Sequence, residues 1–366
     1  MIIDTFKSPY NIKADGKTDN AAGLLRLQKD MAASKEKCFP FFQSGIILSS
    51  FTRWTHKVRS FKAIGNNTTL KSIYTGTDEA QQRGLFAGEM MQNNVLEYKG
   101  TKEYVTTIPI ETARAGDKVI TLKSGKYFAP GERLFIRSGD LFAGGSPRAC
   151  RNFDWVEVEI IGGIQVFLKM PLTEDYFDYD GAEIFSLDEV NYCDHAEFEG
   201  ITFEGNFAYP ARKLILTNCN VTGWLWISEC EEVITNDVYA EKIEADKLVK
   251  KWVANNLRTP SSPSNGGSIY EIEMNDCTTG SSRLCPRYLT LNKPKIWANA
   301  VLINENPDKY DPWIPCIADA PARNPIRRLM LDQCTFTSGS ESQADKNLEF
   351  APFEEIVIIK MSYLPT

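Results

Sequence analysis

The sequence predicts an all-β chain that folds as an elongated solenoid of stacked coils, closed at its N-terminal end by one short α-helix. Three observations lead to this fold class. Helical periodicity is confined to one segment near the N-terminus, many short strands separated by Gly, Asn and Asp follow it, and the second half carries a repeat aligned on cysteine. The chain has 366 residues, of which 43% are hydrophobic, so it can bury a sizeable core.

The helix is predicted over residues 19–33. Thr18 or Asp19 can cap it. Its apolar stripe, near helical spacing, consists of Leu24, Leu25, Leu27 and Met31. The strands predicted after it include "DKVITLKSG", "WVEVEIIGGIQVFLKM" and "AEFEGITFEGN". One helix followed by many short strands argues against an alternating α/β winding.

The repeat has the form of an apolar strand, then Asn, Asp or Gln, then Cys, Thr and Gly. It occurs at 212–223, 269–280 and 327–339. Repeated short strands with a turn residue at a fixed place are typical of a solenoid, in which each coil covers the apolar face of the next. The repeat therefore predicts that Cys219, Cys277 and Cys334 point inward at corresponding positions, each after a residue in a turn or left-handed conformation. Chance similarity of short degenerate strings is the rival interpretation.

Composition disfavours several classes of function. The net charge is −7 and no run is rich in Lys or Arg, which argues against nucleic acid as a partner. No apolar run approaches the roughly 20 residues of a spanning helix, which argues against membrane insertion. The nine cysteines form no C-x-x-C pair, and His56 and His195 are the only histidines. Neither a disulfide framework nor a metal site is predicted, and no cofactor is expected.

The opening stretch "NIKADGKTDNAAGLLRLQKDMAA" resembles the start of the pectate-lyase-like right-handed parallel β-helix superfamily, which includes phage tailspikes and polysaccharide depolymerases. In that superfamily a Gly-Asp-Gly-x-x-Asp-Asp-like turn precedes a helix that caps the solenoid. The matching residues are Asp15, Gly16, Thr18 and Asp19. "CFPFF" (38–42) and "IGNNTTLKS" (64–72) resemble the family's first strand and second coil, and 115–140 with 159–176 resembles a β-rich insertion of tailspike-type members.

The resemblance implies three regions. The cap helix and first coils occupy 1–100, the β-rich insertion with early coils occupies 101–185, and the main coils of a right-handed parallel β-helix occupy 186–366. It further implies a homotrimer, for which the Trp-rich coils around 224–252 are the predicted contact, and other phage tail or virion proteins as further partners.

The function implied is that of a phage- or virion-associated protein that binds host surface polysaccharide, with cleavage left open. Two alternatives remain: a structural or adhesive virion protein without activity, and a bacterial polysaccharide lyase or glycosidase. The N-terminus has no signal-peptide pattern, so the expected location is the virion or the medium after lysis, following synthesis in the host cytoplasm, unless a leader has been removed. Calcium stays open, because the family contains calcium-dependent lyases.

Cleavage of a sugar chain needs either two carboxylates or a base together with cations. Residues two apart on a strand share one face about 6.6–7 Å apart, which overlaps the carboxylate separation of inverting glycosidases. The pairs Glu157/Glu159 and Glu197/Glu199 both fit. The second is preferred, because acidic and basic side chains surround it. The candidate catalytic residues are Glu197, Glu199, Asp194 and His195, and Arg212 is the candidate that orients an acidic sugar.

Phe198 is expected to point into the core and to force both glutamates outward, where crowding would raise the pKa of one of them. The alternative is that the glutamates are the solvated face of a half-buried strand.

Aromatic side chains give further candidates, because a flat ring can cover the apolar face of a sugar. The candidate substrate-binding aromatics are Trp224, Trp226, Tyr310 and Trp313. For the Trp224/Trp226 pair, packing in the core is an equal alternative. The acidic segment "TEDYFDYDG" (173–181) lacks the spacing of an EF-hand and is predicted to be a solvated turn.

Overall fold

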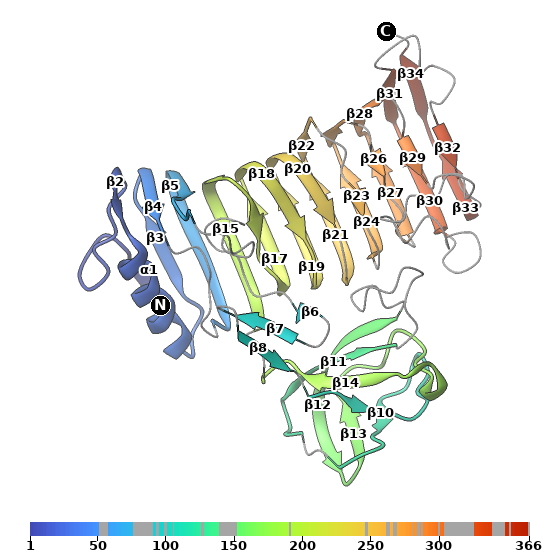
Figure 1. The fold of residues 1–366 in the computed structure, drawn as a ribbon. Coiled ribbons are helices and arrows are strands. Elements are labelled where there is room, and N and C mark those ends of the chain that lie inside the picture. The colour runs from blue at the N-terminus through green and yellow to red at the C-terminus, as the bar shows by residue number, and fades with distance from the viewer. Residues whose placement is uncertain are drawn as a thin grey trace. The chain divides into compact units, whose positions relative to one another are not determined.

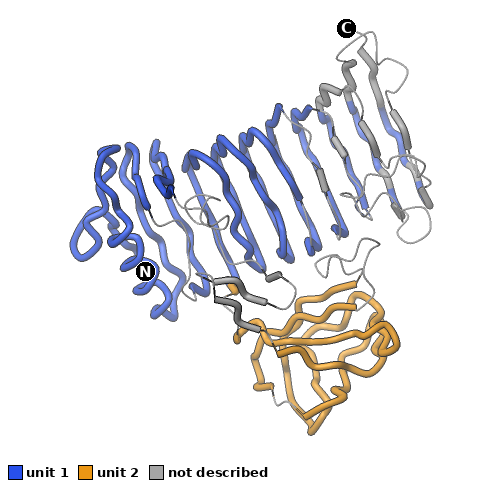
Figure 2. Tube along the Cα trace, in the orientation of Figure 1, with its two compact units in different colours: residues 1–88, 193–366 blue, residues 89–192 orange. Residues whose placement is uncertain are grey.

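The structure is a computed structural model that describes residues 1–50, 58–75, 91–92, 95–98, 101–104, 106–125, 128–138, 152–189, 192–245, 248–260, 264–265, 269–280, 282–283, 286, 288–298, 301–303, 326–338, 348–350 and 353–364. The chain forms two compact units, residues 1–88 with 193–366 and residues 89–192 (Figure 2). The second unit contains the 101–185 segment, and the first resumes at Cys193.

The first unit is a parallel β-solenoid, as the sequence predicts (Figure 1). Its first stack of strands pairs in parallel from coil to coil. The stack consists of β1 (Ile2–Asp4), β3 (Phe39–Phe42), the first part of β5 (Ser60–Ser72), the first part of β15 (Cys193–Glu204), β17 (Ala211–Thr217), β19 (Cys230–Asn236), β21 (Val249–Asn255), β24 (Ile269–Asn275), β27 (Tyr288–Asn292), β30 (Ile326–Asp332) and β33 (Phe353–Ile358).

Two further parallel stacks complete the coils. The second consists of β2 (Asp15–Asp19), β4 (Gly45–Ser49), the later parts of β5 and β15, the first parts of β18 (Asn220–Ile227) and β20 (Tyr239–Ala245), β22 (Arg258–Thr259), β25 (Thr278–Thr279), β28 (Lys295–Ala298), β31 (Cys334–Ser338) and β34 (Met361–Leu364). The third consists of β16 (Phe207–Ala208), the later parts of β18 and β20, β23 (Ser264–Asn265), β26 (Ser282–Arg283), β29 (Val301–Ile303) and β32 (Leu348–Phe350).

The bend between the first and second stacks explains the cysteine repeat. The residue before each repeat cysteine has a positive φ: 50° at Asn218, 52° at Asp276 and 50° at Gln333. Amide and short acidic side chains tolerate this left-handed conformation better than most. The cysteine that follows is then directed into the core, and Cys219, Cys277 and Cys334 are at most 2% exposed. The predicted inward cysteines at corresponding positions are confirmed.

Each repeat cysteine also bonds to the coil before it. The Sγ–H groups of Cys219, Cys277 and Cys334 lie 3.4, 3.3 and 3.4 Å from the carbonyl oxygens of Phe198, Ala254 and Leu291, respectively. Burial raises the pKa of the thiols to about 11 at Cys219 and Cys277 and to about 12 at Cys334. These cysteines are therefore neutral packing groups.

The helix α1 (Ala21–Ala33) packs on the core at the N-terminal end of the solenoid (Figure 1). Its N-cap is Asn20, instead of the predicted Thr18 or Asp19, and its buried face is Leu24, Leu27, Gln28 and Met31. Leu25 is only half-buried. The Asn20 amide is occupied elsewhere, because its Nδ2–H₂ group donates to the carbonyl oxygens of Lys13, Thr18 and Leu48. The side chain thus ties the turn to the next coil instead of capping the helix.

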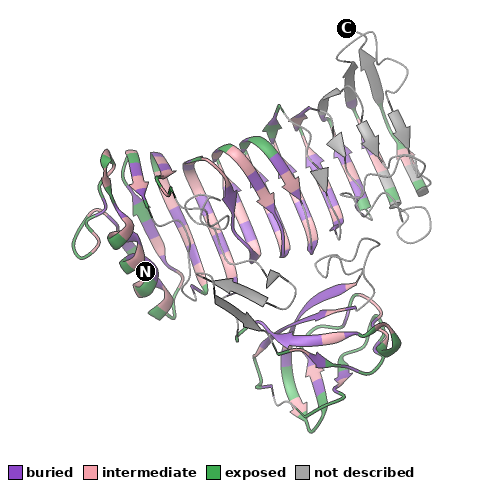
Figure 3. Ribbon diagram, viewed as in Figure 1, coloured by how far each residue is buried: buried purple, intermediate pink, exposed green. Residues whose placement is uncertain are grey.

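Burial alternates along the solenoid strands, and the side chains between the buried ones lie on the outer face (Figure 3). Among the described residues, no helix is long and apolar enough to cross a membrane.

The second unit is antiparallel and has its own core. Its six-stranded sheet has the order β10 (Val119–Thr121), β13 (Gln165–Leu168), β12 (Phe153–Gly162), β11 (Arg133–Arg137), β14 (Glu183–Ser186) and β9 (Ile108–Pro109). A three-stranded sheet of β6 (Met91–Gln92), β7 (Val95–Tyr98) and β8 (Thr101–Tyr104) lies in the same stretch of chain, as does the 3-10 helix η1 (Asp178–Asp180). A bridge between Ile110 and Leu122 links the segments beside the two edge strands, β9 and β10.

Candidate functional site

The preferred glutamate pair lies on the outer face of β15. Phe198, between the two, is fully buried, so Glu197 and Glu199 point outward as expected. Lys62 on the neighbouring β5 is in register with Glu197. Its Nζ atom lies 2.7 Å from Glu197 Oε1 and 2.5 Å from Glu199 Oε2. One lysine therefore forms ion pairs with both carboxylates.

Two more basic groups surround Glu197. Lys37 Nζ lies 3.2 Å from Glu197 Oε2 and 3.3 Å from His195 Nε2. His195 Nε2 is itself 3.6 Å from Glu197 Oε2. Burial and the neighbouring Lys37 charge lower the pKa of His195, against an opposing effect of Glu197. The imidazole is therefore neutral at pH 7 and the two lysines carry the positive charge.

The electrostatics do not suit Glu197 as a general acid. Burial acts to raise the pKa of Glu197, but hydrogen bonds from Lys62 and Lys37 outweigh it and hold the pKa below its usual range. The hydrogen bonds to Glu197 and Glu199 in turn raise the pKa of Lys62. The direction at Glu197 is opposite to the rise expected from a crowded pair of carboxylates, because Lys62 between the two carboxylates and Lys37 beside Glu197 stabilise the ionised form of Glu197. A glutamate kept ionised cannot donate the proton that glycoside hydrolysis needs.

The other predicted members of the cluster have partners of their own. Arg59 Nε lies 2.9 Å from Asp194 Oδ2. Arg212 forms an ion pair with Glu231 on the next coil. The structure therefore brings Glu197, Glu199 and His195 together, whereas Asp194 and Arg212 belong to separate ion pairs.

The two tryptophans of β18 lie on the outer face of the solenoid, so the alternative prediction that they pack in the core is wrong. Leu225 between them is fully buried, while Trp224 and Trp226 are half-buried. Their rings are stacked with centroids 6.0 Å apart and planes 9° apart. Lys242 Nζ lies 5.3 Å from the Trp224 ring centroid, and Trp226 Nε1–H donates to Glu244 Oε2 at 2.9 Å. This arrangement fixes two indole rings in parallel on the surface.

The remaining candidate residues do not form a recognisable site among the described residues. Tyr310 and Trp313 lie outside the described residues. In the second unit, Glu159 is exposed and Glu157 is paired with Lys169.

The acidic turn at 173–181 in the second unit is tied down by ion pairs of Asp175 with Arg114 and of Asp178 with Lys123. Within the described part of the chain, no group of three or more His, Cys, Asp or Glu side chains is placed to hold a metal ion.

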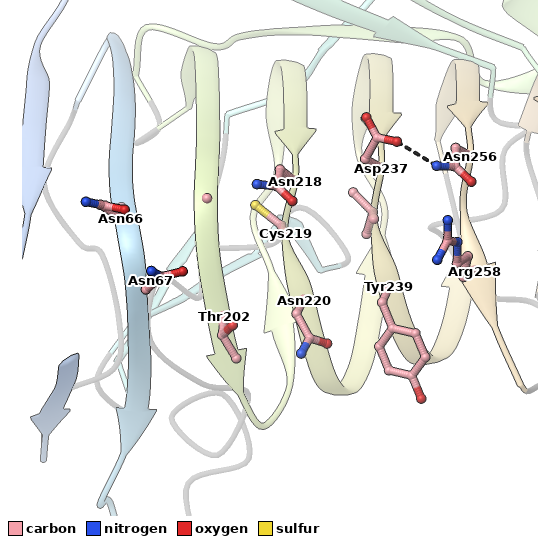
Figure 4. A pocket seen from close by; sticks show the side chains of 13 residues that line it. Asn66, Asn67, Thr202, Asn218, Cys219, Asn220, Asp237, Tyr239, Asn256 and Arg258 are labelled. Atoms are coloured by element: carbon pink, nitrogen blue, oxygen red, sulfur yellow. Dashed lines mark hydrogen bonds between the residues drawn. The ribbon is translucent and has the colours of Figure 1, made fainter. Parts of the chain in front are cut away.

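The sequence did not reveal a polar groove at the bend between the first and second stacks. It has a volume of about 500 Å³ and crosses five successive coils, from β5 to β22 (Figure 4). Two rows of residues line it. The bend row consists of the positive-φ residues Asn67, Gly200, Asn218, Asp237 and Asn256, and the strand row consists of Thr202, Asn220, Tyr239 and Arg258.

Register explains the strand row. Thr202 pairs with Asn220, Asn220 with Tyr239, and Tyr239 with Arg258, so one side chain per coil enters the groove. Within the bend row, Asn256 Nδ2–H donates to Asp237 Oδ1 at 2.6 Å. Asn220 Oδ1 is buried and has no hydrogen-bond partner among the described residues. Because this oxygen is buried, a ligand in the groove does not reach it.

Glycine shapes one end of the groove. Gly200 has φ +67°, and a Cβ there would lie 2.5 Å from the carbonyl oxygen of Gly65 on the adjacent coil. Only glycine allows the two backbones to approach so closely. At this position the bend row has no side chain, so the groove floor there is backbone.

No family model matches the chain, and no curated protein matches it in sequence. Solved structures are similar to it in fold. The tailspike gp61 of Pseudomonas phage phi297 is 10% identical, with a TM-score of 0.51 over 97% of this chain and 69% of that one. The tailspike gp49 of Pseudomonas phage LKA1 is 11% identical, with a TM-score of 0.45 over 97% of this chain and 77% of that one. The Gp54 tailspike of Acinetobacter baumannii bacteriophage AP22, solved with capsular saccharide, is 10% identical, with a TM-score of 0.40 over 98% of this chain and 69% of that one. The chain thus has the parallel β-helix fold of the phi297 tailspike.

Proposed function

We propose that the protein is a tailspike-like component of a phage particle that binds a polysaccharide of the host surface. The observation that carries the proposal is the polar groove across five successive coils. Neighbouring strands of a sheet lie about 4.8 Å apart, so a chain lying along the groove would meet a polar side chain at each such step. A long polymer of hydroxylated units fits this repetition better than a compact small molecule.

The chemistry of the lining supports the same class of ligand. Carboxamide side chains donate and accept hydrogen bonds, as do hydroxyl groups, and both are matched by sugar hydroxyls. Asn66, Asn218, Asn220 and Asn256 supply amides, and Thr202 and Tyr239 supply hydroxyl groups. The stacked Trp224 and Trp226 offer a second surface on the outer face, where a sugar ring can cover an indole. The likeness in fold to a phage tailspike adds to this argument.

Binding without cleavage is the form of the function that we favour. The only predicted carboxylate pair on the solenoid is held by Lys62 and Lys37, and the pKa of Glu197 lies below its usual range. The assignment of Glu197, Glu199, Asp194 and His195 as catalytic residues remains a prediction. Reducing ends or unsaturated products that appear with the wild type and vanish with Glu197→Gln would reverse this preference.

Two exposed tyrosines provide a matched test. Tyr239 lies in the groove and is 40% exposed, whereas Tyr288 on β27 is outside it and 39% exposed. Binding is measured to a panel of purified capsular and O-antigen polysaccharides by biolayer interferometry. Tyr239→Ala should weaken binding about 10-fold, because an aromatic contact contributes roughly 1–2 kcal/mol, and Tyr288→Ala should bind like the wild type. The proposal fails if no polysaccharide binds or if both variants lose affinity equally.

A further inference from the structure

The charged side chains of the groove differ in whether another side chain contacts them. Two charged side chains line it, Asp237 and Arg258. Asp237 is engaged, since its Oδ1 accepts a hydrogen bond from Asn256 at 2.6 Å. Arg258 is exposed, and among the described residues no carboxylate lies within 4.0 Å of its guanidinium. Its backbone is fixed all the same, because its N–H donates to the carbonyl oxygen of Val238 at 2.9 Å.

Two lysines of the first stack in the same region do have carboxylate partners. Lys213 lies 2.5 Å from Glu232, and Lys251 lies 2.8 Å from Glu271. The sequence of this region therefore supplies a carboxylate partner for those lysines on the adjacent coil. Arg258 has Tyr239 as its register partner on one side and Thr278 on the other, and neither can neutralise it. Among the described residues, no carboxylate therefore occupies the five N–H donors of this guanidinium, which lies among the side chains that line the groove (Figure 4).

The strand row places an aromatic side chain beside the Arg258 guanidinium. Tyr239 and Arg258 occupy adjacent coils in register, so their backbones are about 4.8 Å apart. Arginine pairs best with an acceptor that has two oxygens, which a carboxylate supplies in the geometry that the guanidinium prefers. The exposed face of Tyr239 on the preceding coil can cover the apolar face of a sugar ring.

We propose that the groove recognises an acidic sugar unit, which packs on Tyr239 and places its carboxylate on Arg258. This inference rests on the proposed polysaccharide binding and narrows it to uronic-acid-containing polysaccharides. Neutral polysaccharides lack a carboxylate and can offer Arg258 only uncharged acceptors, so they bind the same groove more weakly.

The test compares each acidic polysaccharide with its own neutral form. A panel of purified acidic and neutral bacterial capsular polysaccharides is used, and the carboxyl groups of the acidic members are also reduced to alcohols with carbodiimide and borohydride. The wild type should bind at least one acidic member about 10- to 100-fold more tightly than its reduced form, because a hydrogen bond to a charged group contributes about 1.5–3 kcal/mol.

Arg258→Gln should bring that ratio close to one, and Arg258→Lys, which keeps the charge but not the fork, should give an intermediate ratio. The matched control is Arg328→Gln, an exposed arginine of β30 outside the groove that pairs with Glu355, and it should behave like the wild type. Equal Tm values establish that the variants are folded.

Each outcome decides a different point. If no panel member binds, the proposed function fails and this inference falls with it. If polysaccharides bind but only neutral ones do, or if carboxyl reduction leaves the affinity unchanged, polysaccharide binding stands and the acidic sugar is wrong. If reduction matters but Arg258→Gln keeps the wild-type ratio, the carboxylate is recognised elsewhere and the role of Arg258 is overturned.

Discussion

Asp15 and Asp19 of the opening turn are structural residues. Asp15 accepts hydrogen bonds from the backbone N–H groups of Lys17 and Thr18 and from the Thr18 hydroxyl. Asp19 accepts from Ala21 N–H at the start of α1 and from both the backbone and the hydroxyl of Ser50 on the second coil. The two carboxylates therefore close the turn, start the helix and tie both to the solenoid. This is the physical reason for the "DGKTD" sequence before α1.

Asp15 in this turn makes the stability of the folded protein depend on pH in the acidic range. Hydrogen bonds from the Thr18 backbone and hydroxyl and from the Lys17 backbone lower the pKa of Asp15 from 3.8 to about 2. A carboxyl whose pKa is lower in the folded state stabilises that state above its unfolded pKa, and this contribution is lost as the pH falls. We expect Asp15→Asn to have a lower Tm than the wild type at pH 7, with the difference shrinking between about pH 4 and pH 2. Thermal unfolding across that pH range measures it.

The control for Asp15 is Glu159→Gln, at an exposed position of the second unit, which should keep the wild-type pH profile. If the difference in Tm between the wild type and Asp15→Asn is the same at pH 2 as at pH 7, the charge of Asp15 does not stabilise the turn.

At the scale of elements, a row of asparagine side chains in register links successive coils by hydrogen bonds. Asn255 Nδ2 donates to Asn236 Oδ1 at 2.8 Å, Asn275 Nδ2 to Asn255 Oδ1 at 2.9 Å, and Asn292 Nδ2 to Asn275 Oδ1 at 2.6 Å. The next member in register is Asp332, whose Oδ1 is buried without a hydrogen-bond partner in the described structure. Aspartate has no amide N–H group to donate, so Asp332 does not continue a ladder in which every coil donates to the one before it.

Completing this ladder should stabilise the protein. Asp332→Asn places an Nδ2–H₂ donor opposite Asn292 Oδ1, and one net hydrogen bond contributes about 1 kcal/mol. We expect a higher Tm by differential scanning calorimetry. The matched reverse change, Asn275→Asp, removes a donor from the middle of the ladder and should lower Tm. If both variants unfold at the wild-type temperature, the ladder does not contribute to stability.

The sequence predicted those elements whose signals are local. The helix at 21–33 follows from its apolar spacing, and the bends follow from a short polar residue before each inward cysteine. What it could not predict depends on side chains from different coils. Lys62 lies beside Glu197 only because β5 pairs directly with β15, although the whole second unit separates the two strands in sequence. The groove exists only because Asn220, Tyr239 and Arg258 come into register. The left-handed residues at 218, 237 and 256, each followed two positions later by a polar side chain, were the available signal for the groove.

At the scale of the whole molecule, a solenoid covers the core of each coil with its neighbours but leaves its flanks open to solvent. On the outer face of the first stack, Ile215, Ile234 and Val253 are in register on β17, β19 and β21 and are half-buried. An aliphatic row on the outer face of three successive coils is typical of a surface that another chain covers.

A homotrimer is therefore part of our proposal, with the first-stack face of the coils around 224–252 as the contact, in agreement with the sequence-based resemblance to tailspikes. Light scattering at micromolar concentration should give three times the 41.2 kDa of one chain. Ile234→Glu puts a charge into the predicted contact, where burying it without a partner is costly, so this variant should shift toward monomer at unchanged secondary structure. Ile160→Glu, at a 58%-exposed position of the second unit, is the matched control and should stay trimeric. A monomer mass for the wild type would rule out the trimer, whereas a trimeric Ile234→Glu would move the contact to another flank of the solenoid.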